Sequence, residues 1–428
     1  RSGPRFPSGR RPGDDQLVGR RLASGRFLAL PAVVFVAALG AFTALNGAAA
    51  QPAPQRASDG ATSLAQRGDA ELQRARETAD PGSYERAEAL FRRALGRDPR
   101  NVDATIGMGT LALARHDFRG ALRHGESAHR LAPGLARPYA VLVDAQVELG
   151  DYEAAGRSLQ EMIDLRPNLA SYARVSYFRE LHGDLEGAIE AMELAVSAGG
   201  QVPENVAYVQ TLLGDLEATR GRTDAARRAY ETALTQVPRY APADVGLAEL
   251  DAASGRLDEA IATYRQVGER LPLPQYTIAL GEAELAAGRT ASARETFALV
   301  DVQRRLLAAQ GQNTDLELAL FEADHGSPAR AVRLARQAWD AAPSVRSADA
   351  LGWALTRAGR ADDGLSWARR SLKLGWQEPT ARYHAGMAAR AAGERDEAIS
   401  FLEAALERNP DFSPMRAPKA RRALEELR

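Results

Sequence analysis

Two consecutive stretches of this chain repeat one pattern: VDATIGMGTLALARHDFRGALRHGESAHRLAP at residues 102–133, and ARPYAVLVDAQVELGDYEAAGRSLQEMIDLRP at residues 136–167. Corresponding residues, such as Ala121 and Ala155, lie 34 positions apart, and each copy ends on a proline. Self-similarity at this period is typical of arrays of helix-turn-helix units, in which each unit buries its apolar face only against its neighbours. The two stretches therefore predict a stacked, helical fold.

The same pattern continues on both sides of this pair of units. Its best single copy starts near Ala207 and contains Leu213-Gly214, Gly221, Ala226, Tyr230, Ala233 and Pro238. Small residues such as Ala226 and Ala260 are expected where two helices cross, because a larger side chain would push the backbones apart. Glycines that follow each helical stretch are expected to end it in the left-handed conformation. Aromatic residues such as Tyr230 and Tyr264 are expected to pack as wedges between neighbouring units.

This order of residues resembles the tetratricopeptide repeat family, whose consensus places Leu-Gly, Gly, Ala, an aromatic residue, Ala and Pro in that order. The resemblance covers about Gly68 to Pro410. It implies an all-α, right-handed superhelical solenoid of about ten antiparallel helix pairs, with a concave groove that binds peptides or protein segments. The consensus tryptophan is missing from every unit, and the spacing widens around Gly199–Asn205 and Asp301–Gln312. Each insertion is either a longer turn or a contact at the edge of the groove.

The N-terminal part of the 428-residue chain has a different composition from the repeats. Residues 1–26 are rich in Pro, Gly, Ser and Arg, which predicts disorder. Residues 27–45 contain no charge and small residues follow them, so residues 27–50 predict a signal peptide cleaved near Ala50 or an uncleaved transmembrane anchor. Because an Arg-rich flank stays inside, both alternatives export the repeats, which are then either secreted or held outside the cytoplasm by residues 27–45.

The remaining boundaries follow from the repeat pattern. Residues 51–61 are predicted to be a linker, residues 62–410 the repeat array and residues 411–428 a C-terminal capping helix. The first helix of the array is expected at Ser63–Thr78, and it matches the pattern poorly, as expected of a terminal unit.

Composition and motifs exclude several classes of function. The formal net charge of −1 argues against a nucleic-acid binder, which needs an excess of Lys and Arg. The chain has no cysteine, so disulfides, thiolate metal sites and cysteine nucleophiles are excluded. We find no phosphate-binding Gly-Lys-Ser/Thr loop, no Gly-x-Ser-x-Gly motif and no clustered histidines. The sequence therefore predicts no catalytic residue, no metal and no cofactor.

The family resemblance also implies which side chains face the groove. If the ninth position of each unit faces it, the groove residues include Asp144, Tyr177, Asp215, Glu249, Glu282 and Trp353. The four carboxylates would form an acidic strip, interrupted by an aromatic residue, that favours a basic or mixed-charge partner because a groove concentrates a single-sign field. The alternative is that these carboxylates pair with neighbouring arginines and merely keep the groove hydrated.

These observations predict an exported, non-enzymatic scaffold that binds a partner protein or peptide in a concave helical groove. Two alternatives stay open. One is a self-assembling envelope scaffold whose exposed ends stack on one another. The other is an envelope enzyme whose active site lies in the groove.

Overall fold

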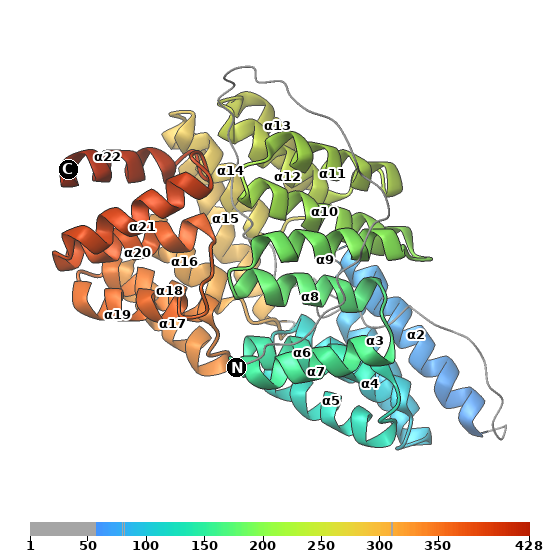
Figure 1. The fold of residues 1–428 in the computed structure, drawn as a ribbon. Coiled ribbons are helices and arrows are strands. Elements are labelled where there is room, and N and C mark those ends of the chain that lie inside the picture. Colours follow the sequence, from blue (N-terminus) through green and yellow to red (C-terminus); the bar gives the residue numbers. More distant parts are fainter. Residues whose placement is uncertain (1–56, 79, 81, 310) are drawn as a thin grey trace, which may run out of the picture.

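The computed structural model describes the backbone of residues 57–428 except residues 79, 81 and 310, and all its regular elements are helices (Figure 1). The helices are α2 (Ala57–Thr78), α3 (Gly82–Arg97), α4 (Val102–Ala114), α5 (Phe118–Leu131), α6 (Ala136–Glu148), α7 (Tyr152–Leu165), α8 (Leu169–Leu181), α9 (Leu185–Ala198), α10 (Pro203–Thr219), α11 (Thr223–Gln236), α12 (Ala241–Ala253), α13 (Leu257–Arg270), α14 (Pro274–Ala286), α15 (Thr290–Ala309), α16 (Asp315–His325), α17 (Pro328–Ala341), α18 (Val345–Arg357), α19 (Ala361–Ser371), α20 (Pro379–Ala392), α21 (Arg395–Arg408) and α22 (Ala417–Leu427).

The helices pack in consecutive pairs. The first pair is α2 with α3, the pattern continues without interruption to α20 with α21, and α22 packs on the last pair. Most second helices also contact the first helix of the next pair, as α5 contacts α6 and α17 contacts α18. This arrangement confirms the predicted all-α solenoid of about ten antiparallel helix pairs.

Short local signals set the ends of these helices. The side chains of Asp117, Asp151 and Asp184 each accept a hydrogen bond from a backbone N–H in the first turn of the helix that follows, which satisfies a donor that the helix itself leaves free. The residue before Asp151 is Gly150, whose φ of 73° is the left-handed conformation that ends the preceding helix. The same conformation recurs at Gly221, where φ is 79°.

Aromatic wedges between units explain the small residues of the repeat. A Cβ atom added to Gly214 on α10 or to Gly246 on α12 would lie 2.4 Å from the ring of Tyr230 on α11. Tyr230 is 1% exposed, so its ring fills the space between two successive first helices. The expected role of Tyr230 as a wedge is confirmed, and the nearby small residues are needed to make room for it.

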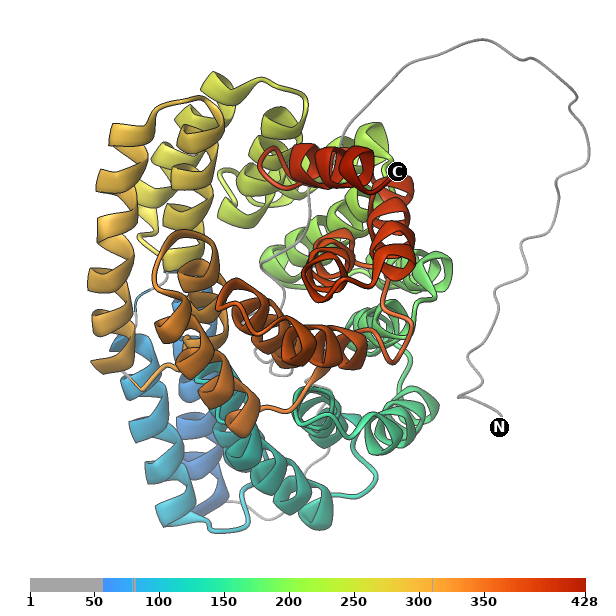
Figure 2. The same ribbon diagram turned by 90° about the vertical axis from the view of Figure 1, so that its left-hand side faces the viewer.

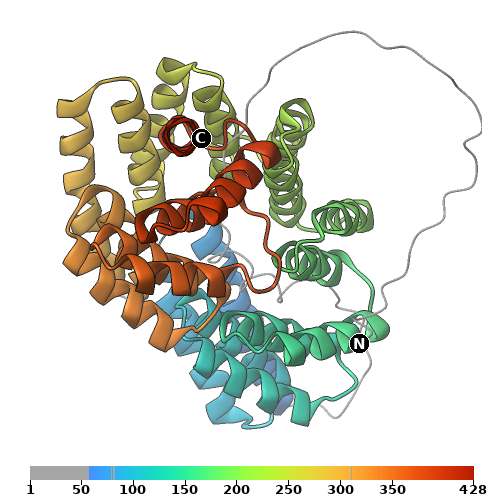
Figure 3. The same ribbon diagram turned by 60° about the vertical axis from the view of Figure 1, so that its left-hand side comes forward.

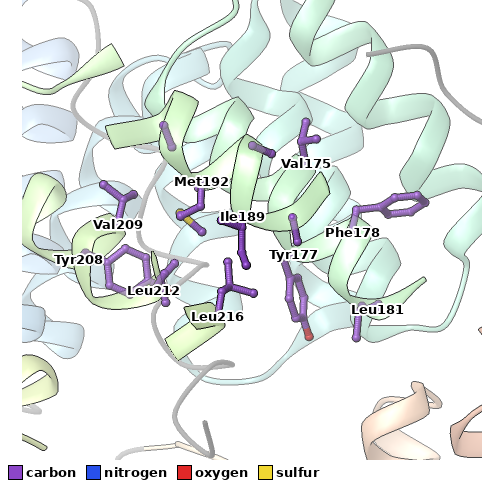
Figure 4. Packing of buried hydrophobic residues seen from close by; sticks show 14 of the residues in the cluster. Val175, Tyr177, Phe178, Leu181, Ile189, Met192, Tyr208, Val209, Leu212 and Leu216 are labelled. Carbon is purple, nitrogen blue, oxygen red and sulfur yellow. The ribbon is translucent and has the colours of Figure 1, made fainter. Parts of the chain in front are cut away.

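The largest apolar cluster lies in the middle of the solenoid. It includes Ile189 and Met192 on α9 together with Leu212 and Leu216 on α10, all of them buried (Figure 4). The spacing of three or four residues along each helix places these side chains on one face.

The solenoid winds so tightly that its C-terminal units contact its earlier ones. Figures 2 and 3 show the red C-terminal helices lying inside the curve that the gold and green helices form. Gln377 Nε2 donates to the carbonyl of Gly183 at 2.6 Å, across 194 residues of sequence. Asn409 Nδ2 donates to the carbonyl of Ala218 at 3.1 Å, across 191 residues. The C-terminal units therefore contact the fourth and fifth units directly at these two places.

The boundaries of the segments predicted from the sequence can be compared with those of the helices. Helix α2 begins at Ala57, so residues 57–61 of the predicted linker are helical, and Ala61 in this stretch is fully buried. The expected insertion at Asp301–Gln312 is not simply a longer turn, because α15 continues through it to Ala309. A C-terminal helix lies at Ala417–Leu427, so residues 411–416 of the predicted capping helix are not helical. The predictions for residues 1–26 and 27–50, and for residues 51–56 of the linker, lie outside the described residues.

Candidate interaction site

Asp144, the first of the predicted groove residues, is engaged by an arginine. Arg174 Nε donates to Asp144 Oδ1 at 2.8 Å, and Arg174 Nη2 donates to Asp144 Oδ2 at 2.7 Å. Asp144 is 9% exposed and Arg174 1%. This bidentate ion pair joins α6 to α8, so Asp144 stabilises the stack of units instead of presenting a charge to a partner.

The two predicted aromatic groove residues are also buried. Tyr177 is 7% exposed, and its hydroxyl donates to Glu148 Oε1 at 3.3 Å. Trp353 is 3% exposed, and its Nε1 donates to Asp324 Oδ1 at 3.1 Å. The prediction that these rings are open contacts in a groove is corrected, because both side chains are buried.

Asp215 takes part in a hydrogen bond within its own unit. It accepts from the Tyr230 hydroxyl at 2.7 Å, which ties the carboxylate to the aromatic wedge. Burial raises the pKa of Asp215 to about 7, although the hydrogen bond from Tyr230 acts to lower it. Because burial disfavours the charged form of this carboxyl group, its contribution to an acidic strip is weakened.

Glu282 lies in a buried charge network. Arg416, between α21 and α22, donates to Glu282 Oε1 at 2.9 Å and to Asp324 Oδ2 at 2.6 Å. His325 Nε2 lies 3.0 Å from Glu282 Oε1. Burial alone would raise both carboxyl pKa values, but Arg416 and His325 hold the pKa of Glu282 below its usual value and lower that of Asp324 to about 2. These charges are kept in place by the C-terminal segment.

The same network contains the spacing of a metal site. The ligand atoms of Glu282, Asp324 and His325 lie within 4.8 Å of one another. The guanidinium group of Arg416 donates to both carboxylates, however, and its positive charge offsets one of their two negative charges. The arrangement is that of a buried ion-pair network and does not indicate a metal centre.

Glu249 is the predicted groove residue with a free carboxyl group. Neither a hydrogen bond nor an ion pair joins it to any other residue that the structure describes. Burial, with a smaller effect from Asp215 and Glu282, raises its pKa well above the usual range. The predicted continuous strip is thus reduced to Glu249 and Glu282, which line one cavity together.

This cavity, which we call the acidic cavity, has a volume of about 130 Å³. Four carboxyl groups and one guanidinium group line it, from Glu249, Glu282, Glu317, Asp324 and Arg416. Tyr264, Tyr276 and Phe321 contribute aromatic walls. The predicted groove position therefore did identify part of a real concave surface, although a much smaller one.

A second, larger cavity was not predicted from the sequence. This tyrosine cavity has a volume of about 630 Å³, within the range of typical ligand-binding sites. Its walls carry Tyr84, Tyr208, Tyr240 and Tyr276, and its charged groups are Arg76, Glu77, Glu204, Arg239, Arg270 and Glu317. The pattern of a few polar groups on an aromatic surface is typical of sites that bind peptides or amphipathic ligands.

The two insertions in the repeat pattern help to form the tyrosine cavity. The cavity is lined by Glu204 and Tyr208 at the start of α10, after the first insertion, and by Leu307 and Gln312 in the second. Arg76 Nη2 lies 2.7 Å from Glu204 Oε2, so the first unit closes one side of the cavity against the fifth. The alternative that the insertions are contacts at the edge of a groove is the one that the structure favours.

A solenoid of paired helices with a concave aromatic cavity defines a helical-repeat scaffold. Tetratricopeptide repeat models match residues 63–136 and 141–203, residues 218–278 and residues 379–412. The chain belongs to the tetratricopeptide repeat family. Membership supports a repeat-based protein-interaction scaffold, a class that is generally non-enzymatic.

The relatives of known name match only part of this chain. Cellulose synthase 1 operon protein C of Komagataeibacter xylinus is 26% identical over 215 residues, which cover 50% of this chain and 14% of that protein. Cellulose synthase operon protein C of Escherichia coli (strain K12) is 30% identical over 179 residues, which cover 39% of this chain and 14% of that protein. This chain thus spans a small share of the length of these relatives.

Solved structures of the same kind match with lower identity. A thermophilic tetratricopeptide repeat protein of Thermus thermophilus is 22% identical, with 44% of this chain and 98% of that chain covered and a TM-score of 0.39. The complex of Cut9 and Hcn1 is 16% identical, with 86% of this chain and 76% of that chain covered and a TM-score of 0.39.

Within residues 57–428, none of the helices combines the length and the apolar character that crossing a bilayer requires.

Proposed function

We propose that this chain is an exported, non-enzymatic scaffold that binds an extended segment of a partner protein in the tyrosine cavity. The observation that carries the proposal is the cavity itself, which is peptide-sized, aromatic and formed by residues of six units. Backbone groups of an extended segment have both donors and acceptors, and the tyrosine hydroxyls together with Arg270 and Gln275 offer partners for both.

The charge of the partner segment follows from the same lining. Three arginines and three glutamates line the tyrosine cavity, so neither sign dominates there. The neighbouring acidic cavity adds an excess of carboxylates on one side. A mixed-charge segment, with its basic residues toward the acidic cavity, is the partner that fits.

Substitution of neighbouring leucines on α15 tests the site. Leu307 lines the tyrosine cavity, whereas Leu306 is 60% exposed and does not. Peptides would be selected from a display library of random sequences with the full chain as bait, and their affinities measured by calorimetry. Leu307→Glu should weaken the selected peptides at least about tenfold, because it places a charge in an aromatic wall, while Leu306→Glu should leave them unchanged. Equal affinities of both variants and the parent would place the peptide site elsewhere.

The export part of the proposal rests on residues 27–50, with their uncharged run and Arg-rich flank. Protease added to intact cells that produce the full chain should degrade an anchored array, and a cleaved array should appear in the medium. Full protection inside a cytosolic fraction would contradict export and leave the cavity proposal intact.

A further inference from the structure

The acidic cavity contains a set of polar atoms that lack hydrogen-bond partners. His384 on α20 is 3% exposed and lines this cavity. Its Nδ1 lies 3.0 Å from Asp349 Oδ2, so the carboxylate holds the ring through that nitrogen. Nε2, on the opposite edge, is buried without a partner among the described residues. Asp349 is not part of the cavity wall, so the ring edge that faces the cavity is the one with Nε2.

Two further groups in the wall share this property. Thr380 stands one turn before His384 on α20, on the same helix face, and its Oγ1 is buried without a partner that the structure describes. Glu317 Oε2 is buried in the same way, and Glu249 has no partner among the described residues either. Buried polar groups are normally satisfied, so a cluster of exceptions around one cavity points to an absent ligand.

The chemistry of these groups defines the ligand. With its Nδ1–H directed at Asp349, the neutral form of the His384 ring accepts at Nε2, and the carboxylate forms of Glu249 and Glu317 also accept. Arg416, the only arginine or lysine in the wall, already donates to Glu282 and Asp324. A ligand with several donors would satisfy these acceptors, and the four carboxyl groups outnumber the one guanidinium group, which favours a positive charge on the ligand.

The size and the apolar walls of the acidic cavity limit the possible ligands further. A volume of about 130 Å³ suits a group of only a few heavy atoms. Tyr264, Tyr276 and Phe321 form walls that would cover a short hydrocarbon chain, while the three donors of an ammonium group reach the acceptors. We propose that the acidic cavity binds a primary ammonium group at the end of a short alkyl chain, through Glu249, Glu317, Thr380 and His384.

The position of the cavity suggests where the ammonium group comes from. Gln275, Tyr276 and Glu317 line both the acidic cavity and the tyrosine cavity, so the two share a wall. A lysine side chain of a segment in the tyrosine cavity would enter the acidic cavity through this wall, and this source rests on the proposed function. A free alkylamine is the other source of the same chemistry, and it does not depend on that function.

The test uses the full chain and the n-butylammonium ion as the probe. Calorimetry and thermal melts should show binding of n-butylammonium and a rise in melting temperature, and no effect of 1-butanol, which has the same chain without the charge. Tetramethylammonium, which has the charge but no N–H donor, should bind at least about tenfold more weakly. Absence of n-butylammonium binding, or equal binding of all three probes, would overturn the proposal.

Two variants distinguish an effect on ligand binding from an effect on the stability of the fold. Glu249→Gln and Thr380→Val keep the size of each side chain, and each removes a polar feature that has no partner. Both should therefore melt at or above the temperature of the parent without ligand. Glu249→Gln should bind n-butylammonium about ten- to a hundredfold more weakly, and Thr380→Val less severely. Glu259→Gln, an exposed change on α13, is the matched control and should bind as the parent does. Unchanged binding in Glu249→Gln would overturn the assignment.

Measurements with the selected peptides distinguish the two sources of the ammonium group, a lysine side chain and a free alkylamine. If a lysine of the selected peptides is the occupant, its replacement by norleucine weakens binding to the parent but not to Glu249→Gln. If norleucine peptides bind equally well while n-butylammonium binding still depends on Glu249, the site belongs to a free amine. Loss of peptide binding alone would contradict the proposed function and not the ammonium site.

Discussion

The backbone N–H of Val345 donates to the hydroxyl of Tyr152 at 2.8 Å, although 193 residues separate the two in sequence. Val345 is the first residue of α18, so its N–H is one of those that a helix cannot satisfy internally. Tyr152, at the start of α7, supplies the acceptor from the opposite turn of the solenoid. The winding of the chain is thus fixed by specific hydrogen bonds as well as by apolar packing.

This contact gives the first prediction. Tyr152→Phe removes the acceptor and leaves a buried N–H without a partner, so it should lower the free energy of unfolding by about 1–3 kcal/mol. Chemical denaturation would measure the loss. Tyr172→Phe is the control, since Tyr172 is half-buried and its hydroxyl has no hydrogen bond within the described part of the chain. Equal stabilities of Tyr152→Phe and the control would mean that the turns do not meet here.

The second prediction concerns the crossing of two helices at Ala260. Its side chain is fully buried on α13, whereas Ala262, two residues further on, is exposed. Ala260→Leu should lower the free energy of unfolding by about 1–3 kcal/mol through overpacking, and Ala262→Leu should change it by less than about 0.5 kcal/mol. Thermal melts of both variants check this. An unshifted melt of Ala260→Leu would place the crossing elsewhere.

Particular residues show what could and could not be predicted from the sequence. Ala260 and Tyr230 recur at fixed positions of a 34-residue pattern, and the contacts that they make lie within one unit or its neighbour, so local spacing was sufficient. The ninth position of each unit was predicted to face a groove, but Asp144 is buried against Arg174, whereas Glu249 lines the acidic cavity. Which residues cover a side chain at this position depends on how several successive units wind around one another. The contact of Glu282 with Arg416, 134 residues away in sequence, is an example. The pattern within a single unit does not determine this winding. The tyrosine cavity, which residues of several units line, was not predicted for the same reason.

The third prediction is the pH dependence of stability. The pKa of Asp215 is raised by burial to about 7 in the folded state, so this group contributes stability at acidic pH that is lost as the pH rises through 7. Asp69 and Glu180, whose pKa values burial also raises to about 7, act in the same direction. The protein should therefore melt at a higher temperature at about pH 5 than at about pH 8.5.

Asp215→Asn tests the origin of this effect. The amide keeps an acceptor for the Tyr230 hydroxyl but cannot ionise, so the variant should lose less stability between acidic and alkaline pH, by on the order of a few degrees in melting temperature. Asp224→Asn, on the exposed side of α11, is the control and should follow the parent. A variant that follows the parent at both pH values would show that Asp215 does not titrate near neutral pH.

The last prediction separates structure from recognition at the predicted groove position. Because Arg174 and Asp144 form a buried bidentate pair, Arg174→Met leaves an uncompensated buried carboxylate and should lower the free energy of unfolding by about 3–5 kcal/mol. The double variant Arg174→Met with Asp144→Leu removes both charges and should recover most of this loss, since a buried pair often contributes little beyond an apolar replacement. Urea denaturation of the parent, both single variants and the double variant gives the coupling between the two residues. If Asp144 acts only within the fold, the double variant should also bind the selected peptides with the affinity of the parent. A double variant that is stable but has lost peptide binding would return Asp144 to the binding surface.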